Sequence, residues 1–432
     1  MLDIRYIREN PEKVQKNAEA KGYSNVSIVD LLKIDDNRRI LQRQVDELRE
    51  RRNANAAKMK GGKPEQSFID EGKQIKLELA DREELLRKAD EEFTVSLKKV
   101  PNMALDFVPV GASEDENVVS KTVGEPPKFD FEPKNHAELA EAKGWLDKER
   151  AAKVAGSRFA YLKGDLFMLE WAVKTFVLNE LTNIDVIKKL IEDNDLDLKP
   201  TALTPVDPPY VARTEAYDAT GRLNREETTY KLAEDDLWLN ASAEHVLAPM
   251  YMNETLDEAT LPIRYVGYTT AFRREAGTYG KDMEGFLRMH QFNKLEMETF
   301  STAETSFAEH KLMVAIQEHI MTKLGLAYNV VQKCTADIGG PNANGVDIDV
   351  WLPGQNQYRE THTADLITDY QTRRMNTRVR RSDGALELAH TNDATAMSQR
   401  PIIAILENNQ TAEGDVVVPA VLRPYMGGRE KI

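Results

Sequence analysis

The chain has 432 residues, of which 41% are hydrophobic and 30% are charged, and its formal net charge is −14. This length allows two or three domains with sizeable cores. The acidic balance excludes nucleic-acid binding over the bulk of the surface, so such a contact needs a local basic patch.

Cysteine, histidine and apolar patterning exclude several other classes of protein. The only cysteine, Cys334, excludes an internal disulfide framework and fits a reducing, cytoplasmic compartment. One cysteine, and seven histidines without HxxxH or HExxH spacing, predict no zinc site. Since no apolar run reaches the ~20 residues that span a bilayer, and MLDIRYIRENPEK lacks an apolar signal core, we expect a cytoplasmic protein without a membrane segment.

The N-terminal quarter reads as helical. Residues 1 to about 25 predict a short capping helix that bends at Pro11. Apolar residues then recur at helical spacing on both sides of the break MKGGKPEQ, and the remaining positions are dense in charge. This pattern predicts two helices of roughly 30 residues each, joined into an antiparallel coiled-coil hairpin about 45–50 Å long. The residues assigned to its apolar stripe are Leu31, Leu32, Ile40, Leu41, Val45, Leu48, Ile69, Ile75, Leu77, Leu85, Leu86 and Phe93.

The middle of this hairpin is locally basic between positions 43 and 63, where it carries only three acids, Asp46, Glu47 and Glu50. A run of charge is most often a solvated helix face. On an acidic chain, it also offers a docking place for a phosphate backbone, because each neutralised phosphate releases counterions. The basic residues of this run are Arg43, Arg49, Arg51, Arg52, Lys58, Lys60 and Lys63.

A linker and a mixed body follow the hairpin. Residues 111–135 predict a linker, and residues 136–432 combine helices with alternating strands. The stretch LTPVDPPYV predicts a strand broken by Pro208 and Pro209, which belongs at a sheet edge because proline cannot donate to a central ladder. Strands dominate residues 232–300, VDIDVWLPG is another strand, and the last helix lies near residues 400–408. Such runs of strands predict an α+β fold whose antiparallel β-sheet is flanked by helices.

The stretch TTAFRREAGTYGKDMEGFLRMHQFNKLEMETF predicts a hairpin with AGTYGKD as its loop. Strand alternation places Arg273 and Glu275 on one face, and it does the same for Phe292, Lys294 and Glu296 on the returning strand. An arginine fork grips phosphate or carboxylate, a carboxylate accepts from an adenine amino group, and an aromatic ring beside a cation holds a nucleobase. A cross-strand salt-bridge ladder gives the same alternation, so the residues alone leave both interpretations open.

These two strands resemble motif 2 of the class II aminoacyl-tRNA synthetases, and the match is closest to the seryl-tRNA synthetases. The motif segments are FRREAG (272–277) and HQFNKLE (290–296). KVAGSRFAYLKGDL resembles the lead-in to the catalytic domain, VDPPYV resembles motif 1, DVWLPGQNQYRE precedes the metal-binding segment, and RPIIAILENNQ resembles motif 3 before the LRPYMGG ending. The hairpin resembles the arm with which this family grips tRNA. Six such pieces in the family's order make coincidence implausible.

The resemblance implies an N-terminal tRNA-binding arm over residues 1–110 and a class II catalytic domain over residues 136–432. It also implies a homodimer formed through the motif 1 region. The implied reaction is ATP-dependent activation of L-serine to seryl-adenylate, followed by transfer of the seryl group to the 3′ end of tRNA(Ser). Mg²⁺ bound with ATP is the implied cofactor, without zinc, and charging of tRNA(Sec) stays open.

The same resemblance assigns roles to individual residues. Arg273 and Arg400 are the implied catalytic residues, and Glu360 and Thr363 the implied Mg²⁺ ligands. The implied ATP-binding residues are Arg273, Arg274, Glu275, Met289, Phe292, Glu360, Thr361, His362, Thr363 and Arg400. The implied serine-binding residues are Ser242, Ala243, Glu244, Arg273, Glu296 and Thr395. The implied tRNA-binding residues are Arg43, Arg49, Arg51, Arg52, Lys58 and Lys60.

The chain departs from the family pattern in several segments. SAE (242–244) stands where Thr-x-Glu is common, ETHTADL (360–366) where EISSCSN is common, and NDATAMSQR where NGSG is usual. Gln399 replaces the glycine before the motif 3 arginine. Counting back from Arg400 puts the serine-contacting hydroxyl at Ala394, and a one-residue gap puts it at Thr395, so both assignments stay open.

Two other functions were weighed against a serine–tRNA ligase. One is an amino-acid ligase of the same fold that charges a carrier protein, and the other is a non-catalytic relative that binds RNA. The arm argues against the first, because such relatives are expected to lack the tRNA-gripping hairpin. The retained pair Arg273 and Arg400 argues against the second, because a binding module has no need of two phosphate-binding arginines.

Overall fold

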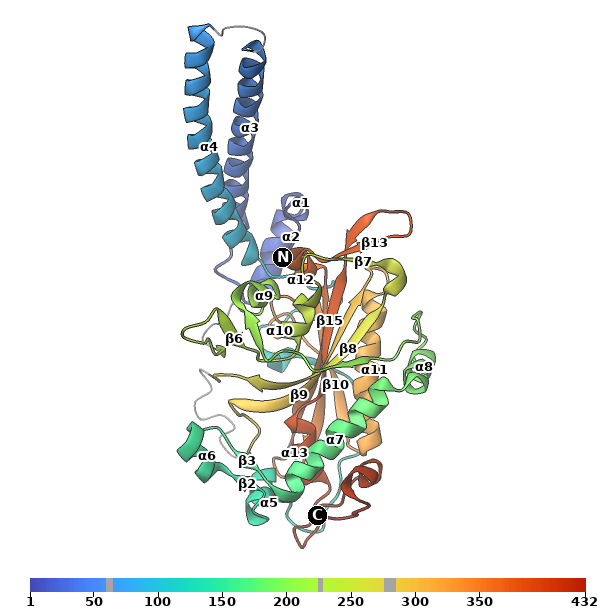
Figure 1. The fold of residues 1–432 in the computed structure, drawn as a ribbon. Helices are drawn as coiled ribbons and strands as arrows, with labels where there is room; N and C mark the ends of the chain where they lie inside the picture. The colour runs from blue at the N-terminus through green and yellow to red at the C-terminus, as the bar shows by residue number, and fades with distance from the viewer. Residues whose placement is uncertain (60–64, 224–227, 276–284) are drawn as a thin grey trace. The chain divides into compact units, whose positions relative to one another are not determined.

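The computed structural model describes residues 1–59, 65–223, 228–275 and 285–432. The described chain forms two compact units, residues 1–103 and 104–432 (Figure 1). The predicted hairpin loop AGTYGKD (276–282) lies outside the described residues. Across the described ranges, no helix is both long enough and apolar enough to cross a membrane.

The first unit is helical, as predicted. Two short helices, α1 (Ile4–Glu9) and α2 (Pro11–Ala20), meet at Pro11, which takes the first position of α2, where its missing N–H costs nothing. Two long helices follow, α3 (Ile28–Lys58, 31 residues) and α4 (Gln66–Lys98, 33 residues), which lie antiparallel (Figure 1). They form the predicted hairpin, and the unit ends at Met103, before the expected boundary at residue 110.

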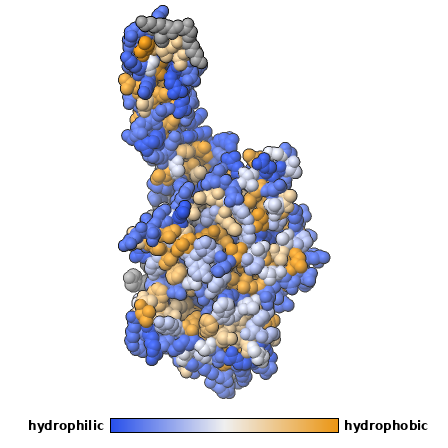
Figure 2. Space-filling model, in the orientation of Figure 1, coloured by the Kyte–Doolittle hydropathy of each residue, from blue (hydrophilic) through white to orange (hydrophobic). Residues whose placement is uncertain are grey.

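The hairpin is held together by a narrow apolar seam. Its core consists of Leu41, Val45, Leu48, Leu79, Leu86 and Ala89. The prediction included Leu77 and Leu85, which instead are exposed, as is Ile40. In α4 the buried side chains follow a spacing of three, four and seven residues, and Leu77 lies on the opposite side of the helix from Ile75 and Leu79. Apolar side chains accordingly show on the surface of α3 and α4 in Figure 2.

The second unit is built on an eight-stranded sheet in the order β1-β10-β11-β12-β15-β9-β8-β4. All neighbours pair antiparallel except β4 and β8, which are parallel, so the predicted α+β fold with a largely antiparallel sheet is confirmed. The strand bounds are β1 Val118–Val123, β10 Tyr328–Gln332, β11 Asn344–Leu352, β12 Gln357–Thr368, β15 His390–Met397, β9 Gln291–Ser301, β8 Ile263–Phe272 and β4 Thr204–Val206.

Two predictions about the edges of this sheet have different outcomes. The proline-broken strand is confirmed as an edge element, because β4 forms one end of the sheet. After Pro208 and Pro209 the chain forms a separate strand, β5 (Val211–Arg213), which pairs with β6 (Leu237–Leu239). The segment 111–135, predicted to be a linker, contains β1, which pairs with β10 and forms the other edge, so it belongs to the second unit.

Helices cover one face of the sheet. The helices α7 (Gly164–Thr182), α11 (Ser306–Leu324) and α13 (Gln399–Asn408) pack on it and share one apolar core with Leu295 and Met297 of β9 and Ala394 of β15 (Figure 1). The remaining elements are α5 His136–Ala142, α6 Lys148–Ala155, α8 Ile184–Asp193, α9 Thr214–Ala219, α10 Glu244–Leu247, α12 Tyr370–Met375, β2 Leu146–Asp147, β3 Tyr161–Leu162, β7 Thr255–Asp257, β13 Arg378–Arg380 and β14 Leu386–Leu388.

The other face of the sheet carries buried polar residues. On β9 the residues Lys294, Glu296 and Glu298 alternate with Leu295 and Met297, and all five are buried. The short helix α10 lies against this face over Gly267 of β8, where a Cβ would stand 2.8 Å from a Leu247 methyl and 3.3 Å from the Ala243 Cβ. A glycine at this position therefore lets α10 approach the strand that pairs with Glu296.

The seam of the hairpin can be tested with one chemical change at two sites on the same helix. Leu79→Ala removes a side chain that is 5% exposed, and we expect it to lower the unfolding free energy of the hairpin by about 2–5 kcal/mol. Leu77→Ala removes a side chain that is 65% exposed and should change this quantity by less than about 0.5 kcal/mol. Native-state hydrogen exchange of α3 and α4 measures both, and equal effects would contradict the assigned seam.

Candidate active site

A cavity lies on the polar face of the sheet, where the end of β8, the start of β9, and strands β12 and β15 meet the start of α13. It brings together predicted site residues whose segments lie far apart in the chain. Its lining residues are Arg273, Glu275, Leu287, Arg288, Met289, Phe292, Lys294, Glu360, Thr361, Thr363, Thr395, Ser398, Gln399 and Arg400.

Arg273 is fixed at the point where β8 ends. Its backbone N–H donates to the His290 carbonyl at 2.9 Å, and Nδ1 of His290 lies 2.8 Å from the Arg273 carbonyl. Its Nε donates to the Ala241 carbonyl at 3.2 Å, and its guanidinium carbon stands 5.2 Å from the centre of the Phe292 ring. The Arg273 guanidinium is thus held beside the Phe292 ring inside the cavity. These two groups suit a ligand that carries both an anionic group and a flat aromatic base.

Glu275 reaches the same cavity by a route that differs from the prediction. The strand ends at Phe272, and Glu275 has a φ of 49°, so strand alternation does not align it with Arg273. Its carboxylate lies 3.6 Å from Arg288, which also lines the cavity and was not predicted. The left-handed backbone at Glu275 therefore turns the side chain toward the cavity after the strand has ended.

Arg400 enters the cavity from the start of α13. The Ser398 side chain caps this helix by accepting from the Arg400 backbone N–H, and Nη1 of Arg400 lies 2.7 Å from the Glu360 carbonyl and 3.0 Å from its Oε1. Burial opposes the charge of Glu360, but Arg400, Lys333 and Arg273 outweigh burial and lower its pKa to about 2. Both arginines therefore act on one carboxylate, although 127 positions separate Arg273 from Arg400 (400 − 273).

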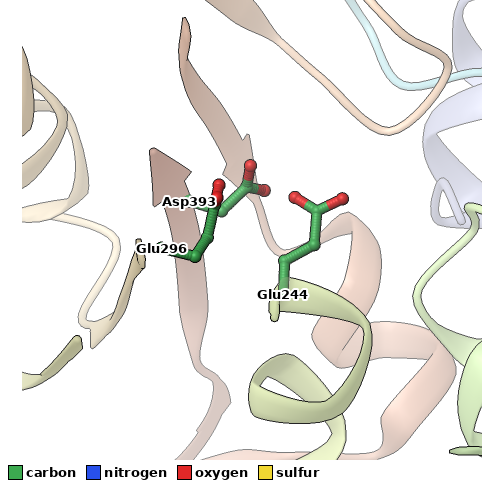
Figure 3. A group of neighbouring side chains, drawn as sticks. All are labelled: Glu244, Glu296 and Asp393. Atoms are coloured by element: carbon green, nitrogen blue, oxygen red, sulfur yellow. The ribbon is translucent and has the colours of Figure 1, made fainter. Parts of the chain in front are cut away.

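Three carboxylates converge beside this cavity, and Figure 3 shows them together. Glu244 of α10, Glu296 of β9 and Asp393 of β15 each place one oxygen within 4.8 Å of the others, and all three are buried. Lys294, which lines the cavity, lies 2.5 Å from Glu296 and 3.2 Å from the Ser242 hydroxyl. The carboxylate cluster therefore adjoins the cavity through Lys294 and offers oxygens to a cationic or hydroxyl-bearing ligand.

The carboxylates of this cluster differ in charge because their surroundings differ. Burial alone would raise the pKa of Glu244, but Arg222, His245 and Asp393 outweigh it and hold that pKa well below its usual range. Burial raises the pKa of Asp393 well above its usual range, and Glu244 adds to the rise. Burial and Glu244 raise the pKa of Glu296 to about 7 against the opposing charge of Lys294. Ionised Glu244 therefore stands beside a neutral Asp393 and a Glu296 that titrates near neutrality.

Known proteins share both the sequence and the fold of this chain. A model for the seryl-tRNA synthetase N-terminal domain matches residues 1–104, and one for the tRNA synthetase class II core domain (G, H, P, S and T) matches residues 228–409. Serine–tRNA ligases of Methanocella arvoryzae and Syntrophobacter fumaroxidans are 38% and 39% identical to it, each over 100% of both chains.

Among solved structures, seryl-tRNA synthetase from Pyrococcus horikoshii in complex with ATP matches with a TM-score of 0.90 and 35% identity, over 100% of this chain and 99% of that chain. The chain belongs to the seryl-tRNA synthetase family. The resemblance found in the sequence is therefore confirmed over the full length.

Two β-bulges set which residues of the seryl-tRNA synthetase face its cavity. On β12, Asp349 pairs with Glu360 and Ile348 with His362, so Thr361 is an extra residue. Without it, the three-residue spacing of Glu360 and Thr363 would put them on opposite faces of the strand. These bulged positions are what allow both predicted Mg²⁺ ligands to line one cavity.

The second bulge decides between the two hydroxyl assignments near motif 3. On β15, Thr395 pairs with Glu296 and Met397 with Leu295, which leaves Ala396 as the extra residue. Thr395 lines the cavity, whereas Ala394 is fully buried in the apolar core. Of these two positions, Thr395 is therefore the one whose side chain lines the cavity.

Two residues of the implied ATP set lie elsewhere. His362 lies across from Ile348 on the helix-covered face, with Nε2 3.3 Å from the Ala396 carbonyl and Nδ1 2.9 Å from the Thr361 hydroxyl. Burial lowers its pKa to about 4, so it is a neutral core histidine that contacts both bulged residues. Arg274 is exposed, and its backbone N–H donates to the Thr228 carbonyl at 2.9 Å. Neither residue belongs to the lining of this cavity.

Acids of the neighbouring helix partly neutralise the basic run on the arm. Arg49 lies 2.8 Å from Glu83 and Arg51 lies 3.7 Å from Glu78, and both acids belong to α4. The prediction counted acids only along α3, so it overlooked these partners. Arg49 and Arg51 therefore contribute less positive field than the sequence implied.

The other basic residues differ in surroundings. Arg43 and Arg52 are exposed on α3. The Lys58 ammonium lies 5.6 Å from the centre of the Phe68 ring, a cation–π distance that also leaves it exposed. Lys60 and Lys63 lie outside the described residues. Arg43, Arg52 and Lys58 are thus the described members of the run that keep their charge toward solvent.

Sequence reasoning missed Arg222, which is central to the carboxylate cluster. Its guanidinium lies 3.3 Å from Glu244, 3.4 Å from Asp365 and 3.1 Å from Asp393, and its side chain is only 18% exposed. It stands in the stretch TGRLN, which has no catalytic pattern. The sequence held one signal that a buried cation is needed. Strands whose other residues are apolar carry an excess of acids, namely Asp365, Asp393 and Glu298.

Proposed function

We propose that this chain is a serine–tRNA ligase, which activates L-serine with ATP and transfers the seryl group to the 3′ end of tRNA(Ser). The observation that carries this proposal is the shared cavity of Arg273 and Arg400 beside the carboxylates of Glu244 and Glu296. Phosphate chemistry needs the two cations, and an amino acid with a hydroxyl needs the acids. The names of the relatives that match at full length support the same reaction.

ATP would lie along the cavity from Phe292 to Arg400. Phe292 offers a ring for the adenine, Glu275 an acceptor for the adenine amino group, and the buried Met289 an apolar wall. Arg273 would grip the α-phosphate and Arg400 the far end of the triphosphate. In such an arrangement the guanidinium groups stabilise the negative charge that builds on the departing pyrophosphate.

Mg²⁺ fits the donors at the triphosphate end. Glu360 supplies a carboxylate, and the Thr363 hydroxyl is buried and makes no hydrogen bond of normal geometry with the described atoms. Hard oxygen donors of this kind suit Mg²⁺, which keeps several waters and shares phosphate oxygens. When bound, the ion would neutralise phosphate charge. Arg400, whose Nη1 lies 3.0 Å from Oε1 of Glu360, would then share this carboxylate with the ion.

Serine would lie at the carboxylate end of the cavity. Arg273 would hold its carboxylate, Glu244 its ammonium group, and Glu296 with Thr395 its hydroxyl, a proposal supported by their positions around the cavity. A buried Glu296 that bonds the hydroxyl would remain unpaired with alanine, which penalises that competitor. Ser242 keeps a hydroxyl in this pocket, 3.2 Å from the Lys294 ammonium, and Ala243 packs against Gly267 of β8.

The reaction needs positioning rather than a protein nucleophile. The serine carboxylate attacks the α-phosphorus in line with the departing pyrophosphate and gives seryl-adenylate. A hydroxyl of the terminal tRNA ribose then attacks the activated carbonyl, and AMP leaves. Arg273 contacts both reacting partners in this scheme, so it aligns them and offsets the charge of the pentacovalent phosphate.

The arm and the exposed surface of α7 suggest the macromolecular partners. Arg43, Arg52 and Lys58 on α3 would contact the tRNA backbone. On α7 the apolar side chains of Phe167 and Trp171 are each 45% exposed and Met168 is 41% exposed. Such a patch, on a helix that contacts the edge strand β4 beside the motif 1 segment, suits a homodimer interface. Because its proposed substrate is tRNA(Ser), we expect the enzyme to work in the cytoplasm.

The role of Arg273 can be tested by substitution. Arg273→Ala should abolish serine-dependent exchange of label between pyrophosphate and ATP, a loss of at least about 10²–10³-fold, because a preorganised charge at the α-phosphate is removed. Arg274→Ala changes the adjacent, exposed arginine and should leave exchange within about threefold of the wild type, as surface positions usually do. Near-normal exchange in the Arg273 variant would refute the assigned role.

The raised pKa of Glu296 predicts a pH dependence of serine use. The serine hydroxyl donates to the ionised carboxylate, so kcat/KM for serine should fall as the pH drops through about 7, by up to roughly tenfold per unit. The kcat/KM for MgATP, measured at saturating serine, should stay nearly constant, because Glu360 remains ionised down to about pH 2. A flat serine profile between pH 6 and 8 would contradict this role of Glu296.

The arm can be tested separately from adenylate formation. The double variant Arg43→Ala/Arg52→Ala removes two exposed charges and should weaken tRNA binding and reduce the slope of its salt dependence by about two, without changing pyrophosphate exchange. A matched control is Arg87→Ala/Arg150→Ala, which removes two exposed, ion-paired charges from other elements. Equal tRNA affinities of the two double variants would argue against a tRNA contact at the basic run.

A further inference from the structure

We infer that Arg222 is a positioning residue for amino-acid activation: its guanidinium holds the Glu244 and Asp393 carboxylates in place, so that they form a cup for the α-ammonium group of the amino acid beside Glu296, which faces the side-chain hydroxyl. This inference rests on the proposed function and extends it to a residue outside the family motifs. Arg222 is not a lining residue of the cavity, so it acts through the carboxylates and not by touching substrate.

The contacts of Arg222 join three separate elements. Nε lies 3.3 Å from Oε1 of Glu244 on α10, and Nη2 lies 3.1 Å from Oδ2 of Asp393 on β15 and 3.4 Å from Oδ2 of Asp365 on β12. A planar guanidinium can meet acids in several directions at once, whereas an ammonium group at the end of a lysine is a point charge. Arg222 therefore fixes α10 relative to the two strands that carry the amino-acid end of the cavity.

The need for this cation follows from the crowding of acids. Glu244, Glu296 and Asp393 approach one another within 4.8 Å, and Glu298 pairs directly across from Asp393 on the same buried face. Unpaired like charges at such spacing repel strongly in a buried site, and carboxylates that lack a cation turn away or take up protons. Lys294 pairs with Glu296. His245 lies 3.0 Å from Glu244, but burial lowers its pKa, so Arg222 supplies the positive charge on the Glu244 and Asp393 side of the cup.

The protonation pattern agrees with this geometry. Burial, Glu244 and Glu296 raise the pKa of Glu298 well above its usual range, as burial and Glu244 do for Asp393. Glu244 alone has a strongly lowered pKa, chiefly because the charge of Arg222 outweighs its burial. The neutral acids thus offer hydrogen bonds while Glu244 presents the negative charge. An ammonium group with three N–H donors matches this set of one anion and neighbouring oxygens.

Arg222 should affect the amino acid and not the nucleotide. The adenine end of the cavity depends on Glu275, Met289 and Phe292, and the triphosphate end on Arg400 and Glu360. None of these belongs to the elements that Arg222 joins except Glu360, which lies on β12 five positions before Asp365 (365 − 360). A purely structural salt bridge would instead lower stability without raising KM for serine more than KM for ATP.

The test compares Arg222→Lys with the wild-type chain in pyrophosphate exchange. We expect KM for serine to rise about 10- to 100-fold, the usual effect of losing hydrogen bonds to charged groups, and KM for ATP to stay within about twofold. Arg264→Lys is the matched control, because Arg264 makes a buried bidentate pair with Glu309 at 2.8 Å through both nitrogens. It should lower the melting temperature and leave both Michaelis constants near wild type.

A second variant covers the case in which Arg222→Lys does not fold. Arg222→Gln with Asp393→Asn replaces the buried charge by amides, and should also raise KM for serine more than KM for ATP. A serine KM within about threefold of wild type in either folded variant, or equal rises in both Michaelis constants, would overturn the inference. A wild-type chain without serine-dependent exchange would overturn the proposed function itself, and this inference with it.

Discussion

Two guanidinium groups that repel each other are held at one cavity, and much of the second unit serves to keep them there. Arg273 is anchored at the end of β8 by the carbonyls of Ala241 and, through its backbone, His290. Arg400 is anchored at the start of α13 by Glu360. Each anchor satisfies part of the arginine fork and leaves the rest for an anionic ligand. The sheet order, which places β9 and β15 side by side, brings the two anchors to the same face.

The opposite charge gathers at the other end of the same site. Arg222 lies among acids of α10, β12 and β15, and burial raises the pKa of Asp393 beside it and of Glu298 on β9 well above the usual range. The site is thus polarised, with cations at one end and acids at the other. Under the proposed function, this separation of charge would align an amino acid with ATP in one direction, which is the alignment that adenylate formation needs.

Much of this fold could be predicted from the sequence, because the relevant signals are local. The apolar periodicity of α3 and α4, the edge position of a proline-broken strand and the helix at the end of motif 3 all follow from spacing and residue type. The polar residues of motif 2 and motif 3 carried the resemblance, and most of them line one cavity. Leu77 and Leu85 were misassigned because a count of apolar residues does not track the turn of a long helix.

The parts that could not be predicted depend on register and on partners distant in sequence. The extra residues Thr361 and Ala396 decide which side chains of β12 and β15 face the cavity, and bulges have no sequence signature here. They explain why His362 lies in the core and why Thr395 replaces Ala394 in the site. Arg222 and the acids of α4 opposite Arg49 and Arg51 are evident only once the elements pack. Strand β1 was predicted to be part of a linker because its side chains are nearly all exposed, and its pairing with β10 is evident only in the folded sheet.

The most direct test of the convergence of Arg273 and Arg400 is a crystal structure with a non-hydrolysable seryl-adenylate analogue, such as seryl sulfamoyl-adenosine. We expect the sulfamoyl group against Arg273, the adenine against Phe292 with its amino group toward Glu275, and the serine ammonium facing Glu244. A ligand bound with its serine end away from Glu244 and Glu296, or bound without contact to Arg273, would contradict this expectation.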